Sequence, residues 1–161
     1  MNGQYDNCFI RPASGDDAEF LLDIRNTPEI VALGSTQRTV DLAEHREWLA
    51  RVLASGDHLL FVVECSDRAE RIGYARLDRG EGRSAVITIA IVKSWRGRSI
   101  GPVVITHAAN EAFACWDQVD VVIAYVLDDN RPSSRSFLKA GFTPTEEYSR
   151  ESHQVLILER T

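Results

Sequence analysis

The chain has 161 residues, a length typical of one domain that can bury a full hydrophobic core. Hydrophobic residues make up 44% of it and charged residues 26%, values that are ordinary for a soluble globular protein. The formal net charge is −6. No apolar run approaches the roughly 18 residues needed to span a bilayer, which excludes a membrane-spanning protein.

The cysteines and the N-terminus bear on the compartment. Residues 1–7 contain no apolar core of a signal peptide. The three cysteines, Cys8, Cys65 and Cys115, are odd in number and form no C-x-x-C pair, so the sequence implies neither a disulfide framework nor a zinc site. We therefore expect a reduced, cytoplasmic setting and no metal.

The predicted elements, taken in chain order, form one α/β domain over residues 8–161 with a mixed sheet. They are a strand at 8–13, a helix capped by Ser14 that ends near 25, a helix capped by Asp41 that ends near 53, strands at 58–65, 72–78 and 84–92, a helix at 102–115, a strand at 119–127, a helix at 133–140, and strands at 143–150 and 153–159. The last two strands should form a hairpin, and the crossover from 84–92 to 119–127 should be parallel and right-handed.

The segment after strand 84–92 indicates an anion site. Gly97 and Gly101 bracket a short turn where φ can be positive, and Pro102 suits the first position of the following helix. A strand, a turn and a helix start leave several backbone N–H groups unpaired and convergent, and the helix dipole favours an anion there. Three cations add to this, Lys93, Arg96 and Arg98. The alternative is an ordinary strand–helix turn with solvated arginines.

A second basic segment follows strand 119–127. Residues 128–130 make a polar break, Pro132 and Ser133 suit the start of a short helix, and Gly141 suits its C-terminal stop. Its cations are Arg131, Arg135 and Lys139. Two basic turns in an acidic chain favour a small polyanionic ligand over nucleic acid. The alternative is a helix with a solvated basic face.

The two segments together resemble motifs of the GNAT superfamily of N-acetyltransferases. Arg96-x-x-Ser99-x-Gly101 resembles its pyrophosphate loop, and Asn130-x-x-Ser133 with Phe137 and the run 139–142 resembles its second motif. The resemblance extends to residues 11–12 and 16–18, and so covers most of the chain.

This resemblance implies a GNAT-like fold and acetyl-CoA as co-substrate. The backbone of Ile91 and Lys93 would hold the pantetheine arm, the N–H groups of 98–101 would hold the pyrophosphate, and Asn130 would meet the pantetheine or the amine. The implied cofactor-binding residues are Ile91, Val92, Lys93, Arg96, Gly97, Arg98, Ser99, Ile100, Gly101, Asn130, Ser133 and Phe137.

Three residues depart from the family pattern. Ser99 stands where the loop usually has glycine, so its φ must stay negative or its hydroxyl must find a local partner. Phe137 stands where many members have the tyrosine thought to protonate the leaving thiolate, and Val86 stands where many have a glutamate base. Phe137 should then pack against the pantetheine arm without acting as an acid.

The remaining candidates for catalysis each have a structural alternative. Ser134 could donate to the sulfur or bond to backbone in the first helical turn. Asp78 could bind the amine or be a solvated acid at a strand end. His45, on one helix face with Trp48, could be a base or a half-buried structural histidine. Tyr125, His107 and His153 are weaker candidates, and ordered water could carry the proton instead.

The acceptor is expected to lie against the first 55 residues. Residues 24–30, Ser35 and the run 44–49 resemble two branches, amino-sugar N-acetyltransferases acting on nucleotide-activated sugars and ribosomal-protein N-terminal acetyltransferases. The short, non-acidic segment 34–38 favours the sugar branch, because a peptide target asks for an acidic groove. Arg25, Asn26 and Asp78 are the candidate acceptor-binding residues.

The sequence therefore predicts an acetyl-CoA-dependent N-acetyltransferase that acts on a small amine, with a nucleotide-activated amino-sugar as the leading acceptor. A protein N-terminal acetyltransferase and a non-catalytic acyl-CoA-binding module remain alternatives. A small-molecule amine is the expected partner, with no nucleic acid and no membrane, in a monomer or homodimer.

Overall fold

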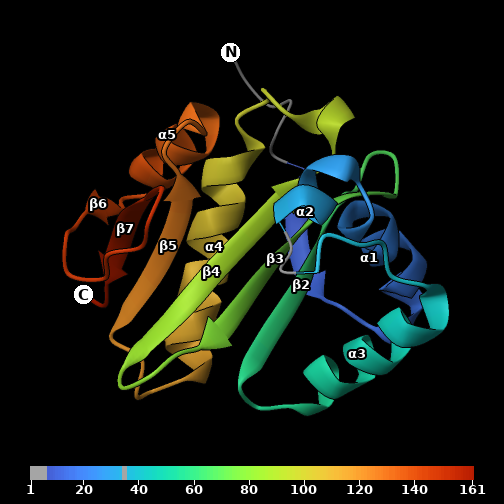
Figure 1. Cartoon of the computed structure of the whole chain (residues 1–161), viewed down its shortest axis with the longest axis horizontal. Helices are drawn as coiled ribbons and strands as arrows, with labels where there is room; N and C mark the ends of the chain where they lie inside the picture. The colour runs from blue at the N-terminus through green and yellow to red at the C-terminus, as the bar shows by residue number, and fades with distance from the viewer. Residues whose placement is uncertain (1–6, 34–35) are drawn as a thin grey trace.

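A seven-stranded sheet forms the centre of the computed structural model, which describes residues 7–33 and 36–161 (Figure 1). The strand order is β1-β2-β3-β4-β5-β7-β6, and the parallel pair β4–β5 stands among antiparallel neighbours. The strands are β1 Cys8–Pro12, β2 His58–Cys65, β3 Glu70–Arg79, β4 Ser84–Ile91, β5 Val121–Leu127, β6 Thr143–Pro144 and β7 His153–Glu159. The expected mixed α/β sheet, with its parallel crossover, is confirmed.

Five α-helices and two short 3-10 turns connect the strands. The helices are α1 Ala18–Arg25, α2 Pro28–Leu33, α3 Leu42–Ala54, α4 Ile100–Cys115 and α5 Arg131–Lys139, and the turns are Gly15–Asp17 and Lys93–Trp95. Among the described residues, none of the helices has the length and apolar character that a membrane crossing requires.

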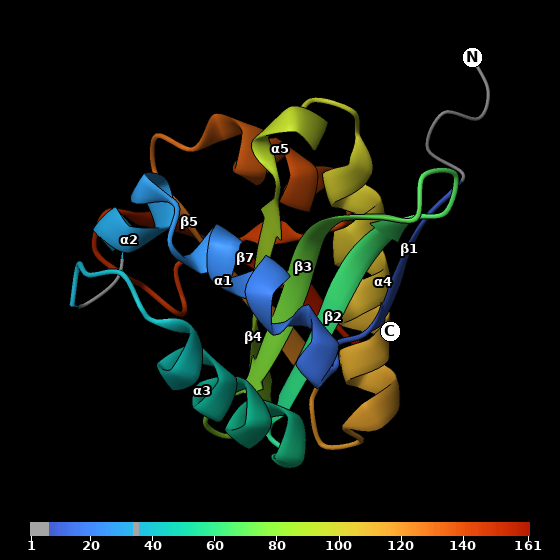
Figure 2. The same ribbon diagram turned by 90° about the vertical axis from the view of Figure 1, so that its right-hand side faces the viewer.

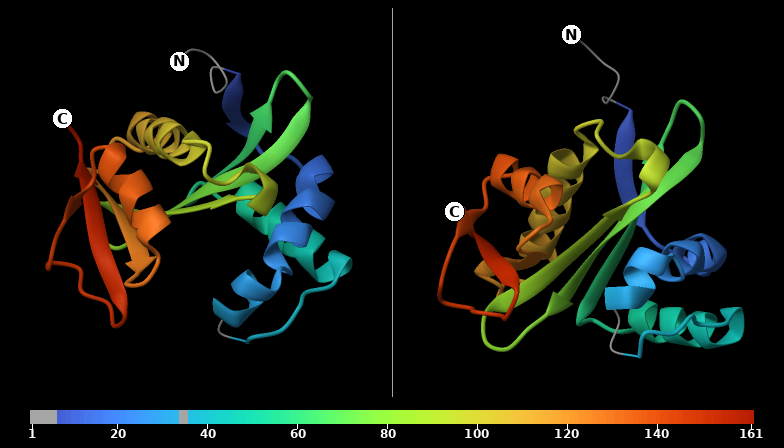
Figure 3. Two further views of the ribbon diagram at one scale, coloured as in Figure 1. Left: turned by 90° about the horizontal axis from the view of Figure 1, so that it is seen from above. Right: turned by 45° about the horizontal axis from the view of Figure 1, so that its top comes forward.

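The helices cover opposite faces of the sheet (Figures 2 and 3). The helix α4 packs with Ile105, Ala108 and Ala112 against the larger of two buried clusters, and its alanines let it lie close to the strands. The helices α1 and α3 pack on the other side, where Leu21 and Leu49 join the smaller cluster with the inner residues of β2. We call the side of α1 and α3 the front face.

Alternation along the strands decides which side chains reach the front face. In β3, Ala75 and Leu77 belong to the cluster under α4, so Tyr74, Arg76 and Asp78 point to the front. Directly paired residues share a face, so Thr88, opposite Arg76, also lies at the front, where it is exposed. On the front face, α1 and α3 therefore cover β2 and leave Thr88 of β4 exposed.

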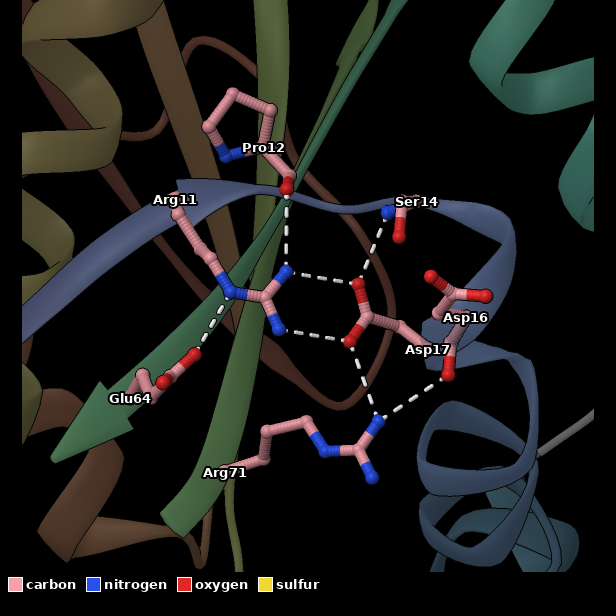
Figure 4. Close-up of polar contacts among 7 residues, drawn as sticks. All are labelled: Arg11, Pro12, Ser14, Asp16, Asp17, Glu64 and Arg71. Atoms are coloured by element: carbon pink, nitrogen blue, oxygen red, sulfur yellow. Dashed lines mark hydrogen bonds and ion pairs between the residues drawn. The ribbon is translucent and has the colours of Figure 1, made fainter. Parts of the chain in front are cut away.

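An ion-pair network around Asp17 holds the segment between β1 and α1 to the sheet (Figure 4). Asp17 is 1% exposed and accepts two 2.9 Å hydrogen bonds from the Arg11 guanidinium and one from the Ser14 amide. Arg11 also donates to Glu64 on β2 at 2.7 Å, and Arg71 lies 3.3 Å from Asp17. Hydrogen bonding to Arg11 lowers the pKa of Asp17 to about 2. The network thus fixes the path of the chain from β1 into α1.

Three expectations differ from the structure. The helix α2 was not predicted, and α4 begins at Ile100, which makes Pro102 its third residue. The strand expected at 143–150 stops at Pro144, although the short β6 does pair antiparallel with β7. The Thr145 hydroxyl accepts a hydrogen bond from the Glu147 amide, and this local turn replaces the ladder.

We predict that Asp17→Asn lowers the free energy of unfolding by about 3 kcal/mol, because two arginines lose a buried counter-charge. Since the folded-state pKa of Asp17 lies below its ordinary value, its contribution is present above about pH 4 and is lost as the pH falls toward 2. Urea unfolding at several pH values measures both effects. Asp16→Asn, an exposed neighbour, is the matched control. An Asp17→Asn protein as stable as the control would contradict the assignment.

Candidate functional site

The strands β4 and β5 pair over three residues and then diverge. The pairs are Ser84–Val121, Ala85–Val122 and Val86–Ile123, after which β4 stays paired with β3 and β5 with β7 (Figure 1). Beyond Val86, one side of β4 therefore has no partner strand within the described chain. We call this opening the fork.

The backbone groups that face the fork can be identified. The Gly80 amide donates to the Ser84 carbonyl, and the Val92 amide donates to the Ile72 carbonyl, so the even-numbered residues of β4 face β3. The odd-numbered residues Ile87, Ile89 and Ile91 consequently direct their amides and carbonyls toward the fork side, where the Ile87 amide pairs with β5 and the Ile91 carbonyl accepts from Arg96. An extended ligand with amide groups can pair with this edge as an added strand does.

A loop with two left-handed residues leads from β4 to α4. Gly97 has φ 73° and Ser99 has φ 60°, and the Ser99 hydroxyl makes no capping hydrogen bond. The expectation that Ser99 keeps a negative φ or finds a hydroxyl partner is therefore wrong. The loop turns into α4 at Ile100, so the unpaired N–H groups of the first helical turn begin directly after it. These groups and the positive end of the helix dipole favour an anion.

Gly101 lies inside α4 and is not among the positive-φ residues. A Cβ atom at this position would come within 2.9 Å of the Ser136 Oγ on α5. Its small size thus allows α5 to pack closely on α4, and Gly101→Glu would disturb this packing besides any ligand. The same helix α5 is capped by Asn130, whose side chain accepts from the Ser133 amide at 3.3 Å. Both basic turns therefore meet beside the fork.

Two residues of α5 are engaged inside the protein. The Phe137 ring is 3% exposed and packs edge-to-face on Phe142, with ring centroids 5.1 Å apart. Phe137→Ala would therefore open a cavity in the core. The Ser134 hydroxyl donates to the Gln154 Oε1 on β7 at 2.7 Å, so its partner is a side chain and not the backbone.

The side chain of Arg96 spans the mouth of the fork. Its Nε donates to the Ile91 carbonyl at 2.9 Å, and its Nη1 lies 3.3 Å from the Glu29 Oε2 on α2. Both charged groups are largely exposed, which keeps this ion pair weak. Arg98 instead stacks over the Trp95 ring at 4.5 Å.

Asp78 and His58 form an acid–histidine pair. They are aligned across the sheet with Val86 and Ile123, the last paired residues of β4 and β5 before the fork. The Asp78 Oδ1 contacts the His58 Nδ1 at 2.5 Å and accepts from the Arg76 Nε at 2.8 Å. Asp78 is thus one strand away from Val86, the position where a family glutamate was expected.

Unpaired polar atoms lie at the edge of the front face between α1 and α3. His45 is 4% exposed and stacks on Trp48, and its Nε2 has no hydrogen-bond partner in the described part of the chain. The Arg25 Nη1 is also buried without a partner there. Burial lowers the pKa of His45, and the nearby Arg25 lowers it further. The Asn26 amide, by contrast, is fully engaged with the Val40 backbone at 2.8 and 2.9 Å.

The structure brings most of the predicted residues to one region. Residues 91–101, Asn130 and Ser133 surround the fork and the start of α4, whereas Asp78, Arg25 and His45 lie on the front face. The predicted residue Ser35 and its neighbour Gly34 lie outside the described residues. Over 7–33 and 36–161, no group of three or more His, Cys, Asp or Glu side chains is placed to hold a metal.

Sequence analysis missed two residues, His58 and Glu29. The alternation of strand 58–65 places His58 on the front face, but its pairing with Asp78 depends on the register between two strands. Glu29 was inside a segment assigned to the acceptor side, yet its contact with Arg96 joins positions 67 residues apart. No local pattern reports such a contact.

Comparisons with known proteins agree with this geometry. A protein-family profile described as "Acetyltransferase (GNAT) domain" matches residues 7–143. No curated protein sequence matches the chain significantly. Among solved structures, a domain from Methanocaldococcus jannaschii is 18% identical with a TM-score of 0.78, covering 95% of this chain and 98% of its own.

Two enzymes bound to coenzyme A have the same fold. The aminoglycoside acetyltransferase AAC(6')-Ib, in complex with ribostamycin and coenzyme A, is 21% identical with a TM-score of 0.77, covering 96% of this chain and 94% of its own. The spermidine N-acetyltransferase from Vibrio cholerae, in complex with CoA and spermine, is 18% identical with a TM-score of 0.76, covering 94% and 93%. The sequences are too distant for these likenesses to show more than the fold.

We predict that Ser99→Gly stabilises the protein by about 0.5 kcal/mol, because relief of left-handed strain exceeds the entropy that glycine adds to the unfolded chain. Gly97→Ala, at φ 73° and with no atom within 4 Å of the added Cβ, should destabilise it by about 1 kcal/mol through backbone strain alone. Urea unfolding midpoints measure both changes. Effects of equal sign in the two variants would rule out backbone strain as their cause.

Proposed function

Because the chain belongs to the GNAT acetyltransferase family, we propose that residues 8–161 form one domain that transfers an acetyl group from acetyl-CoA to the amine of a small acceptor. The observation that supports this most is the fork, which joins an unpaired strand edge to the anion-binding start of α4. The family expected from the sequence is the family that the comparison finds. The two enzymes bound to coenzyme A have the same fold, which supports acetyl-CoA as the co-substrate.

The co-substrate has a place in the fork that fits its chemistry. The pantetheine arm has two amide groups, which suit the carbonyl of Ile87, the amide and carbonyl of Ile89 and the amide of Ile91. The pyrophosphate suits the amides of 98–101 at the start of α4. Lys93, Arg96 and Arg98 supply positive charge beside it, and Asn130 and Ser133 line the side formed by α5. Phe137 would support this side from within the core.

Acetyl transfer then requires that the acceptor amine lose a proton and attack the thioester carbonyl, after which the carbon–sulfur bond breaks. Asp78 is the best-placed group to bind the ammonium, because its Oδ1 is held by His58 and Arg76 on the front face beside the fork. His58, oriented by Asp78 through Nδ1, would take the proton through water at its other ring nitrogen. This pair would replace the glutamate that Val86 does not supply.

The charges of the front face bear on the acceptor. The buried Arg25 Nη1 has no hydrogen-bond partner among the residues that the structure describes, and Arg150 lies over the Tyr125 ring at 5.2 Å. A buried guanidinium N–H without a hydrogen-bond partner favours an acceptor group on the ligand, and the positive charge of Arg25 favours an anionic one. A nucleotide-activated amino-sugar carries such a group as its phosphates, whereas the polycations spermine and ribostamycin would gain nothing from Arg25. We therefore keep the nucleotide-linked amino-sugar as the leading acceptor and a protein N-terminus as the alternative.

A screen of acceptors tests the proposal by the release of free thiol from acetyl-CoA. We expect turnover to be fastest with a nucleotide-linked amino-sugar, slower with a peptide, and slowest with spermine or an aminoglycoside. Arg25→Ala should raise the KM for the anionic acceptor about tenfold or more, because a charge-assisted hydrogen bond is lost. The KM for acetyl-CoA should not change. Arg46→Ala, an exposed charge on α3, is the control.

Other outcomes of the screen have distinct meanings. Preference for the peptide would replace the sugar by the protein acceptor, and preference for spermine would remove Arg25 from the acceptor site. Calorimetric binding of CoA at micromolar affinity without turnover of any amine would leave a non-catalytic acyl-CoA-binding module. Absence of CoA binding at millimolar concentration would contradict both the acetyltransferase and the acyl-CoA-binding module.

We predict that His58→Gln lowers kcat/KM about a hundredfold, because the proton acceptor is lost. Asp78→Asn should raise the KM for the amine while the affinity for CoA is kept. His107→Gln, an exposed histidine on α4, is the control. Thiol-release rates and CoA affinities measure these effects, and an unchanged kcat/KM in His58→Gln would assign proton transfer to water alone.

A further inference from the structure

Two of the three cysteines lie directly opposite each other on neighbouring strands. Cys8 is the first residue of β1, Cys65 is the last residue of β2, and the two are paired in the antiparallel register. Their pairing depends on strand register, and α1, α2 and α3 all lie between the two residues in the chain. The third cysteine, Cys115, is exposed at the end of α4.

The backbone hydrogen bonds show whether Cys8 and Cys65 form a hydrogen-bonded or a non-hydrogen-bonded pair. The Ser66 amide donates to the Asn7 carbonyl at 2.9 Å, and the Ala13 amide donates to the Leu60 carbonyl at 2.9 Å. Hydrogen-bonded and non-hydrogen-bonded pairs alternate along an antiparallel ladder, so Cys8 and Cys65 form a non-hydrogen-bonded pair. The Cα atoms of such a pair are about 4.5 Å apart. A disulfide accommodates Cα separations from about 4.4 to 6.8 Å.

The two side chains share one face of the ladder. Cys65 is 6% exposed and belongs to the cluster under α4, and the half-buried Cys8 packs against the same cluster. Burial raises the pKa of the Cys8 thiol, and Cys65 raises it further, as expected for two neighbouring sulfur atoms. Cys8 is the more accessible of the two, so it can meet a reagent from solvent.

We propose that Cys8 and Cys65 are a redox modification site that forms an intramolecular disulfide with a low-molecular-weight disulfide as oxidant. The Cys8 thiolate attacks the oxidant and expels one thiolate, and the Cys65 thiolate then attacks the Cys8 sulfur and expels the second. One sulfur–sulfur bond forms and one breaks. Two electrons pass to the oxidant, and the two protons of the cysteines end on its two thiols.

The bond would attach an edge strand to the sheet. Within the part of the chain that the structure describes, β1 is an edge strand paired with β2, and Cys8 is its first residue. A covalent link there prevents β1 from separating at that end, and β1 carries Arg11, the partner of Asp17. Oxidation would therefore stabilise the fold, and a thiol reductant would reverse the effect.

The test oxidises the folded Cys115→Ser protein with oxidised glutathione, followed by an acid quench and thiol titration in denaturant. We expect the two remaining thiols to fall to zero, peptide mapping to find Cys8 linked to Cys65, and the unfolding temperature to rise until dithiothreitol is added. The Cys8→Ser, Cys115→Ser protein is the control and should form no intramolecular link. The natural chain, treated in the same way, should keep at most one of its three thiols.

Two results would overturn the proposal. One is a folded protein that keeps both thiols or carries glutathione adducts in their place. The other is a Cys8–Cys65 link that forms in the unfolded chain alone. Neither result depends on acetyl transfer, so failure here leaves the proposed function untouched.

Discussion

Three residue pairs between β4 and β5 join the two parts of the sheet. The strands β1 to β4 form one part and β5 to β7 the other, and α4 crosses from one to the other on the far side. If the parallel ladder were longer, the backbone of β4 would be fully paired and would have nothing to offer a ligand. If it were absent, the loop before α4 and the start of α5 would not be held beside the same opening. The short ladder is thus the constraint that creates the site.

The front face depends on a different kind of interaction. The buried ion pair between Arg11 and Asp17 fixes the path from β1 into α1, and the Asn26 amide then ties the end of α1 to Val40 before α3. Arg25 and His45 occupy their positions because both helices are held in this way. Within residues 7–33 and 36–161, the buried Arg25 Nη1 and His45 Nε2 have no hydrogen-bond partner, which is the pattern expected where a ligand supplies the missing partner.

Much of this arrangement could be predicted from the sequence. The strand 58–65 was located to the residue, because a run of apolar and β-branched residues ends in polar turns on both sides. The order of strand, basic loop and helix at 84–115 was also predicted, since glycine and charge mark it locally. The conformations within the loop were not. Ser99 adopts a left-handed backbone that its own side chain does not favour, and Gly101 is small because α5 approaches it. The pairings of Asp78 with His58 and of Cys8 with Cys65 depend on register, which no local pattern contains.

The contact between Arg96 and Glu29 has a thermodynamic consequence. The arginine belongs to the loop at the fork and the glutamate to α2, so one ion pair joins the two sides of the site. An anion that takes the Arg96 Nη1 displaces the carboxylate, and it thereby leaves Glu29 free for a cation. Linkage requires the reverse effect to be equal in size, so a cation that takes Glu29 makes Arg96 more available to the anion. Two ligands of opposite charge would thus help each other to bind without touching, and added salt would weaken their cooperation.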